Sequence, residues 1–217
     1  MTPVRVLMIG MMLVVAAQAG VAAACSVRGG YRVPTALDLA VRADTIVIAT
    51  VDGARPGPDG DIGSVLAMPG TLLKGRALPQ RILLPDAMLT TDRRMLFRSD
   101  PRELREPNEG ALLGACVRYA FVRGMKLVLF LERDATGALV PIRATFARDA
   151  EDVGGPDALW VRTVREYVAV ANLPADARPD ALRRRIVVLR AKGGADARAI
   201  AADMEIELRT PPRPASD

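Results

Sequence analysis

Short runs of apolar, β-branched residues between polar turns mark the first two thirds of the chain. Residues 45–51 (TIVIATV) have the density of β-branched side chains that is typical of a strand, and a loop rich in proline and glycine follows. Residues 64–74 predict a second strand, broken near Met68-Pro69-Gly70 because proline cannot donate a hydrogen bond to a neighbouring strand. Residues 81–84 predict a third strand.

A hairpin is predicted further along the chain. Residues 126–132 (KLVLFLE) and 138–143 supply its two strands, and Asp134-Ala135-Thr136-Gly137 supplies the turn. Residues 85–109 have a mixed, polar pattern. They predict an insertion or long loop with one short strand around 95–97.

The spacing of apolar residues becomes helical after Gly154-Gly155-Pro156. Helices are predicted at 156–171, 179–192 and 196–208. The apolar positions of the first, interpreted as core, are Leu159, Trp160, Val164, Tyr167 and Val168. A shorter helix, 36–42, is predicted near the start because Thr35 is a good N-cap and Asp38, three residues on, forms a partial capping box.

Strands first and helices after predict an α+β protein, in which a small β-barrel or sandwich precedes a C-terminal helical appendage. We expect a signal peptide at 1–24, the barrel at 25–153, the helical segment at 154–209 and a flexible, proline-rich tail at 210–217.

The first 24 residues have the pattern of a removable secretory signal. Arg5 precedes an apolar run, 6–15, and a small-residue stretch, 16–24, that suits a signal peptidase. Alanine, Gln18 and Gly20 interrupt the strongly apolar run before it reaches the roughly twenty residues of a membrane span. We therefore expect an exported protein, periplasmic or secreted.

The amino-acid composition excludes several classes of catalytic and binding site. The 217 residues include no histidine, which excludes Ser-His-Asp and Cys-His nucleophilic arrangements and histidine zinc ligands. The carboxylates form no paired motif, and no phosphate-binding glycine loop is present, so we expect no enzyme, no cofactor and no metal site. The net charge of +5 comes from arginines interleaved with Asp and Glu, and aromatic residues are few, so we expect no nucleic-acid partner.

The chain has two cysteines, Cys25 and Cys116. In an oxidising compartment we expect them to pair, and closing a loop of this length stabilises a fold by roughly 4 to 5 kcal/mol in the chain-entropy model. The alternative is that Cys25 is the acylated first residue of an envelope lipoprotein, since Ala22-Ala23-Ala24-Cys25 partly matches the box before such cysteines. Only then would we expect contact with a membrane.

Several short segments resemble, as a set, the OB-fold domain of the tissue inhibitors of metalloproteinases and their netrin-like bacterial relatives. The segments are Cys25 after the signal, Ala43-Asp44, TIVIATV, residues 71–75 (TLLKG), Ala115-Cys116 and residues 121–130 (FVRGMKLVLF). The resemblance covers about residues 25–142. It implies a five-stranded Greek-key barrel, an OB-like fold.

In inhibitors of that family the α-amino group and carbonyl of the N-terminal cysteine chelate the zinc of the protease. Carried over, these atoms belong to Cys25, and Ser26 points into the specificity pocket. The chain departs from the family pattern at Val27, where a second cysteine is usual, and in the helices after Gly155.

Three functions are thus predicted. The first is a non-catalytic exported binding protein on an OB-like barrel, whose partner is a protein or an envelope component. The second is a metalloprotease inhibitor that acts through Cys25, and the third is a lipoprotein acylated at Cys25.

Overall fold

The fold was analysed in a computed structural model, which describes residues 29–58, 62–92, 99, 104–112 and 115–210. The chain divides into two compact units, Met1–Tyr31 and Arg32–Asp217, and every helix and strand described below lies in the second.

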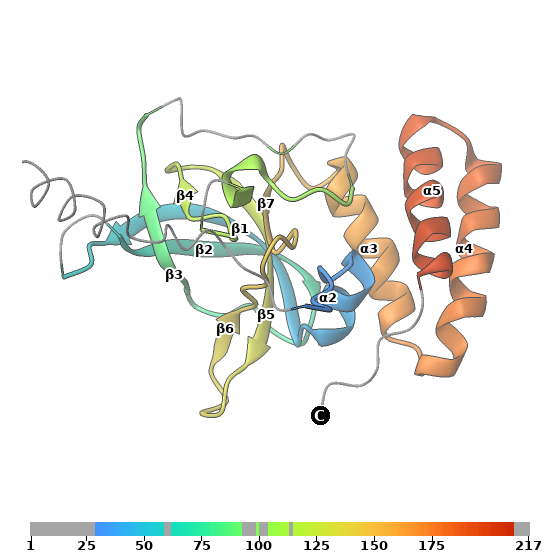
Figure 1. The fold of residues 1–217 in the computed structure, drawn as a ribbon, viewed down its shortest axis with the longest axis horizontal. Coiled ribbons are helices and arrows are strands. Elements are labelled where there is room, and N and C mark those ends of the chain that lie inside the picture. Colours follow the sequence, from blue (N-terminus) through green and yellow to red (C-terminus); the bar gives the residue numbers. More distant parts are fainter. Residues whose placement is uncertain (1–28, 59–61, 93–98, 100–103, 113–114, 211–217) are drawn as a thin grey trace, which may run out of the picture. The chain divides into compact units, whose positions relative to one another are not determined.

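The second unit is a mixed α+β structure built on an open sheet of seven strands (Figure 1). The strands are β1 (Thr45–Arg55), β2 (Gly63–Lys74), β3 (Ile82–Leu89), β4 (Ala120–Phe121), β5 (Lys126–Arg133), β6 (Leu139–Pro141) and β7 (Ala150–Asp152). They are hydrogen-bonded in the order β4-β3-β2-β1-β5-β6, and β7 also pairs with β5. All pairs are antiparallel except β3 with β4.

The two central strands, β1 and β5, are buried on both faces over residues 46–49 and 127–131, where every residue is apolar. Side chains on one face join a core shared with the helices: Ile46, Ile48, Val128 and Phe130. Side chains on the opposite face join a second core with residues of β2 and β3: Val47, Ala49, Val51, Leu127, Leu129 and Leu131. Each fully buried side chain of this size contributes about 1.5 to 3 kcal/mol.

The first three predicted strands and the first strand of the predicted hairpin are present, with longer bounds. The expected break near Pro69 is instead an irregularity inside a continuous β2, because Ile48 pairs with Thr71 and Ala49 with Pro69, which leaves Gly70 without an opposite residue. Pairing of β2 with β3 ends at Ala67, so the proline occupies a stretch where β2 has β1 as its only described neighbour.

The sequence predicts a loop over residues 85–109. The predicted start of this loop is wrong, because β3 continues through Pro85 to Leu89. The short strand expected around 95–97 lies outside the described residues. Two strands, β4 and β7, have no signal in the sequence. They are two or three residues long, and pairing with β3 and β5, rather than local preference, holds them in the sheet.

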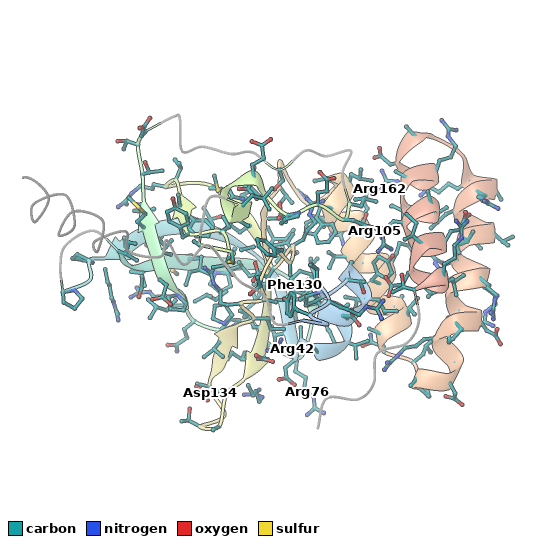
Figure 2. All side chains as sticks on the ribbon, in the orientation of Figure 1. Arg42, Arg76, Arg105, Phe130, Asp134 and Arg162 are labelled. Atoms are coloured by element: carbon teal, nitrogen blue, oxygen red, sulfur yellow. The ribbon has the colours of Figure 1, made fainter. Side chains whose placement is uncertain are left out.

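The β5–β6 hairpin and its turn are present, although β6 is shorter than the predicted strand at 138–143. The Asp134 carboxylate, at the tip of the hairpin in Figure 2, accepts hydrogen bonds from the backbone N–H groups of Thr136 and Ala138 at 2.8 and 3.0 Å. Gly137 has a φ of 83°, a conformation that favours glycine.

Helix α2 (Ala36–Arg42) begins where the sequence places it, with a complete capping box. The Thr35 hydroxyl accepts from the backbone N–H of Asp38, and the Asp38 carboxylate accepts from the backbone N–H of Thr35. At the other end, the ammonium of Lys74 donates to the carbonyls of Ala40 and Ala43 at 2.8 and 2.6 Å, which fastens the helix to the end of β2.

The C-terminal helices are α3 (Leu159–Ala171), α4 (Arg178–Lys192) and α5 (Ala195–Arg209), close to the predicted bounds. Figure 1 shows α3 beside the sheet, with α4 and α5 on its far side. Buried residues of all three helices belong to the same core as α2 and one face of the sheet. The predicted boundary after residue 153 therefore separates strands from helices that share a core, and whether it separates domains stays a prediction.

Among the described helices, none combines the length and the apolar character needed to cross a bilayer.

Replacing Thr35 tests the start of α2. Thr35→Ala removes the cap and the hydrogen bond that the hydroxyl donates to Glu207, so we expect the free energy of unfolding to fall by about 1 to 2 kcal/mol. Thr35→Ser keeps the hydroxyl and should lose much less. Urea unfolding of both variants measures the difference, and equal losses would contradict the capping role.

Candidate functional site

The residues that the sequence singles out are only partly described. Cys25 and Ser26 lie outside the described residues. Cys116 is disulfide-bonded, and its pairing with Cys25 stays a prediction. The carbonyl of Cys116 accepts a hydrogen bond from the backbone N–H of Phe146 at 2.7 Å, so the cysteine adjoins the loop between β6 and β7. Both residues have a positive φ, 58° and 57°, which is rare outside glycine.

A cavity of about 160 Å³ lies within the second unit, away from both cysteines in the sequence. It is formed by the segment before α2 and the first residue of that helix, the segment at 104–105, the β6–β7 loop, α3 and α5. Its walls are Val33, Pro34, Thr35, Ala36, Leu104, Arg105, Arg148, Trp160 and Asp203.

One wall of the cavity is a stacked pair. Arg148, on the β6–β7 loop, lies with its guanidinium carbon 4.4 Å from the centre of the Trp160 ring, a cation–π geometry. Both side chains are 4% exposed. Trp160 is held there because it stands in the first turn of α3, whose apolar face packs on the sheet.

Polar groups of this pair lack partners. Arg148 Nη2 contacts Glu151 Oε2 at 3.3 Å, whereas Nε and Nη1 of Arg148 and Nε1 of Trp160 have no hydrogen-bond partner in the part of the chain that the structure describes. Buried N–H groups are nearly always paired in folded proteins, and leaving one unpaired costs about 1 to 3 kcal/mol. All three atoms are enclosed by protein atoms, so they do not open onto the cavity although their residues line it.

Two other lining residues, Arg105 and Asp203, belong to a paired network. Arg105, labelled beside the C-terminal helices in Figure 2, forms an ion pair with Asp203 at 2.7 Å and approaches Glu207 at 3.5 Å. The Tyr167 hydroxyl donates to Asp203 Oδ2 at 2.5 Å, and the Thr35 hydroxyl donates to Glu207 Oε1 at 3.0 Å. This network joins the start of α2 to α3 and α5.

Burial tunes the ionisation of this network. It raises the pKa of Tyr167 far above its ordinary value, and the negative charge of Asp203 acts in the same direction, so Tyr167 stays a hydrogen-bond donor. Burial also raises the pKa of Glu207, against the opposing effects of the Thr35 hydrogen bond and the Arg105 charge.

Behind Arg148 the charges are buried and matched. Glu151 accepts from the backbone N–H of Asn108 at 2.9 Å and from the Ser99 hydroxyl. Arg118 pairs with Asp152 at 2.6 Å. Although burial acts to raise it, this ion pair and hydrogen bonds from Ser99 hold the pKa of Asp152 below its usual range.

Asp149 differs from its charged neighbours. Burial raises its pKa to about 7, although the Arg143 charge and a hydrogen bond from the backbone N–H of Ala144 act to lower it. Asp149 is 2% exposed and directly follows Arg148 in the sequence. Near neutral pH this group exchanges its proton inside the fold.

The cavity's hydroxyl, on Thr35, already accepts from the Asp38 backbone and donates to Glu207. Among the described residues, no group of three or more Cys, Asp or Glu side chains is placed to hold a metal ion.

Sequence reasoning missed this site. Trp160 was interpreted as core, and it does belong to the core, but it also lines the cavity. Arg148 lies in a stretch, residues 148–152, where four of the five residues are charged, a composition that is typical of solvated surfaces. The sequence carries no signal for this cavity because its walls come from five separate segments.

Comparison with known proteins gave no further guide: no family model matches the chain, and neither the curated proteins nor the solved structures contain a match.

The buried carboxyl group of Asp149 makes the free energy of unfolding depend on pH. Because the folded-state pKa of Asp149 lies above its unfolded value, the folded protein binds the proton more tightly, and this stabilisation is lost as the pH rises from about 4 to about 7. Relative to Asp149→Asn, the wild type should therefore lose stability across that window, by on the order of 1 to 4 kcal/mol. Urea unfolding at a series of pH values measures this, with Asp157→Asn, at an exposed position, as the control. Parallel curves for wild type and Asp149→Asn would contradict the assignment.

Proposed function

We propose that this protein is a non-catalytic exported binding protein and that the cavity beside Trp160 is its binding site. The observation that carries the proposal is the cavity itself, about 160 Å³ in volume, whose walls combine apolar side chains with the polar groups of Arg105, Arg148 and Asp203. A concave, mostly apolar site with a few polar groups is the usual form of a small-molecule binding site.

The other groups around the cavity support binding over catalysis. Asp203 is held by Arg105 and by the Tyr167 hydroxyl, so it has no free role as a base. The sequence has no histidine to activate a nucleophile. The cavity therefore offers recognition groups without an acid–base pair aimed at a common point.

An OB-like barrel remains part of the proposal. Strand β1 pairs with both β2 and β5, and β3 pairs in parallel with β4 while also approaching β6. A core on the side of the sheet away from the helices, shared by β1, β2, β3 and β5, suits a sheet that curls towards closure. These features support the barrel that the resemblance to metalloproteinase inhibitors implies.

Occupancy of the cavity can be tested on protein taken from its native host. Native mass spectrometry should find a small non-covalent ligand that is lost on denaturation. Ala36→Leu, which places extra volume in the cavity wall, should abolish the added mass, whereas Ala191→Leu, at an exposed position of α4, should keep it. A wild type that carries no ligand, or an Ala36→Leu variant that keeps it, would contradict the proposed site.

One observation also favours the inhibitor alternative. Cys116 is disulfide-bonded, and pairing with Cys25 would fix the N-terminal residue whose amine and carbonyl the resemblance assigns to zinc chelation.

The state of Cys25 decides between the alternatives. We expect the mature protein to begin at Cys25 with a free amine and to gain two hydrogens in mass on reduction, because the two thiols pair. Intact mass with N-terminal sequencing measures this, and a metalloprotease inhibition assay follows. A mass increased by acyl chains would identify a membrane-anchored lipoprotein, block the amine and contradict the inhibitor function.

A further inference from the structure

We propose that the outer face of the α4–α5 helix pair binds anionic phospholipid, so that the protein lies on a membrane surface without crossing it. This face, called the basic face below, goes beyond the proposed function, because the cavity beside Trp160 takes no part in it. Its residues, all exposed, are Arg184, Val187, Val188 and Ala191 of α4 with Arg198 and Arg209 of α5.

The α4 part of the basic face points away from the core. Residues 184, 187, 188 and 191 are spaced i, i+3, i+4 and i+7, which places them on one side of the helix, opposite the buried Leu182, Ile186 and Leu189. Val187 and Val188 are 67% and 51% exposed. Valine is a weaker helix former than alanine or arginine, so neither helix formation nor core packing accounts for two adjacent exposed valines.

The α5 part of the basic face lies beside the α4 part. Arg198 and Arg209 are spaced i and i+11, about three helical turns, and so share one side of α5. Glu205 forms ion pairs with Arg190 of α4 and with Arg209, which brings this side of α5 next to α4. Figure 1 shows the two helices side by side at the end of the second unit away from the sheet.

The charge of the basic face is positive and only partly compensated. Arg184 and Arg198 form no ion pair with any residue that the structure describes. Two carboxylates beside the face, on Asp180 and Glu205, each pair with arginines. The arginines on or beside the face number five: Arg183, Arg184, Arg190, Arg198 and Arg209.

These features favour a lipid surface over a protein partner. An anionic membrane attracts each nearby arginine, and four or more basic residues on a helix face are typical of proteins that bind such membranes. Protein interfaces centre instead on large anchors in pockets, whereas the apolar residues of the basic face are valine and alanine. A second copy of the chain, paired through the same face, would set arginines against arginines.

Binding to vesicles tests the proposal. The chain from Cys25 onward, exported behind a signal that is cleaved without acylation, carries no lipid anchor of its own. We expect it to co-sediment at low salt with vesicles of phosphatidylglycerol and phosphatidylcholine, and to bind vesicles of phosphatidylcholine alone at least roughly tenfold more weakly. Sodium chloride at about 0.5 M should release it, because salt screens exposed charges.

A pair of double variants locates the contact. Arg184→Gln with Arg198→Gln leaves no carboxylate of a described ion pair without its partner, and it should weaken binding to the anionic vesicles roughly tenfold or more. The control, Arg76→Gln with Arg81→Gln, removes the same charge at exposed positions between β2 and β3, and should leave binding nearly unchanged. Ala36→Leu, which obstructs the cavity, should also bind the vesicles as the wild type does.

An added tryptophan reports which surface meets the lipid. Fluorescence of Val187→Trp should be quenched by brominated phospholipid in the anionic vesicles. Leu78→Trp, at an exposed position between β2 and β3, should not be quenched. The wild type, whose sole tryptophan is Trp160 and is 4% exposed, gives the background signal.

The outcomes separate this proposal from its alternatives. Equal losses in the two arginine double variants, or equal quenching in the two tryptophan variants, would overturn it. Binding of poly-glutamate that depends on Arg184 and Arg198, without binding to anionic vesicles, would overturn it in favour of an acidic protein partner. A protein that carries a ligand in its cavity but binds no vesicles would contradict the lipid contact alone, and the reverse result would contradict the cavity function alone.

Discussion

The fold depends on burying both faces of β1 and β5. Residues 46–49 and 127–131 of these strands are all apolar, so neither face of the central pair can be left in water there. One face is covered by the neighbouring strands β2 and β3 and their side chains, and the other by helices. Every other element of the second unit is placed by one of these two demands.

The helices that cover one face of β1 and β5 also form the cavity. Helices α2 and α3 reach the sheet from opposite ends of the sequence, and α5 is joined to them through Tyr167, Asp203 and Glu207. The helices pack through their buried faces and leave a space where they meet the β6–β7 loop, beside Arg148. The candidate site is thus a consequence of how the helices close one core.

Buried charges give this region its chemical character. Paired ions such as Arg118 with Asp152 satisfy each other, although moving them out of water returns little net stability. Arg148 contacts Glu151, and its guanidinium stacks on Trp160 where both residues line the cavity. A buried cation therefore lies beside the apolar lining of the candidate site.

Elements whose signals are local could be predicted from the amino-acid sequence. The Thr35–Asp38 capping box, the run TIVIATV, the Asp134–Gly137 turn and the apolar spacing of the C-terminal helices each act within a few residues, so the α+β class followed from them. Other features arise only from packing in three dimensions: the irregular pairing at Pro69, the short strands β4 and β7, and the meeting of Arg148, Trp160 and Asp203. These depend on contacts between residues far apart in the chain, and a contact of that kind leaves no periodic or local pattern in either of the segments that make it.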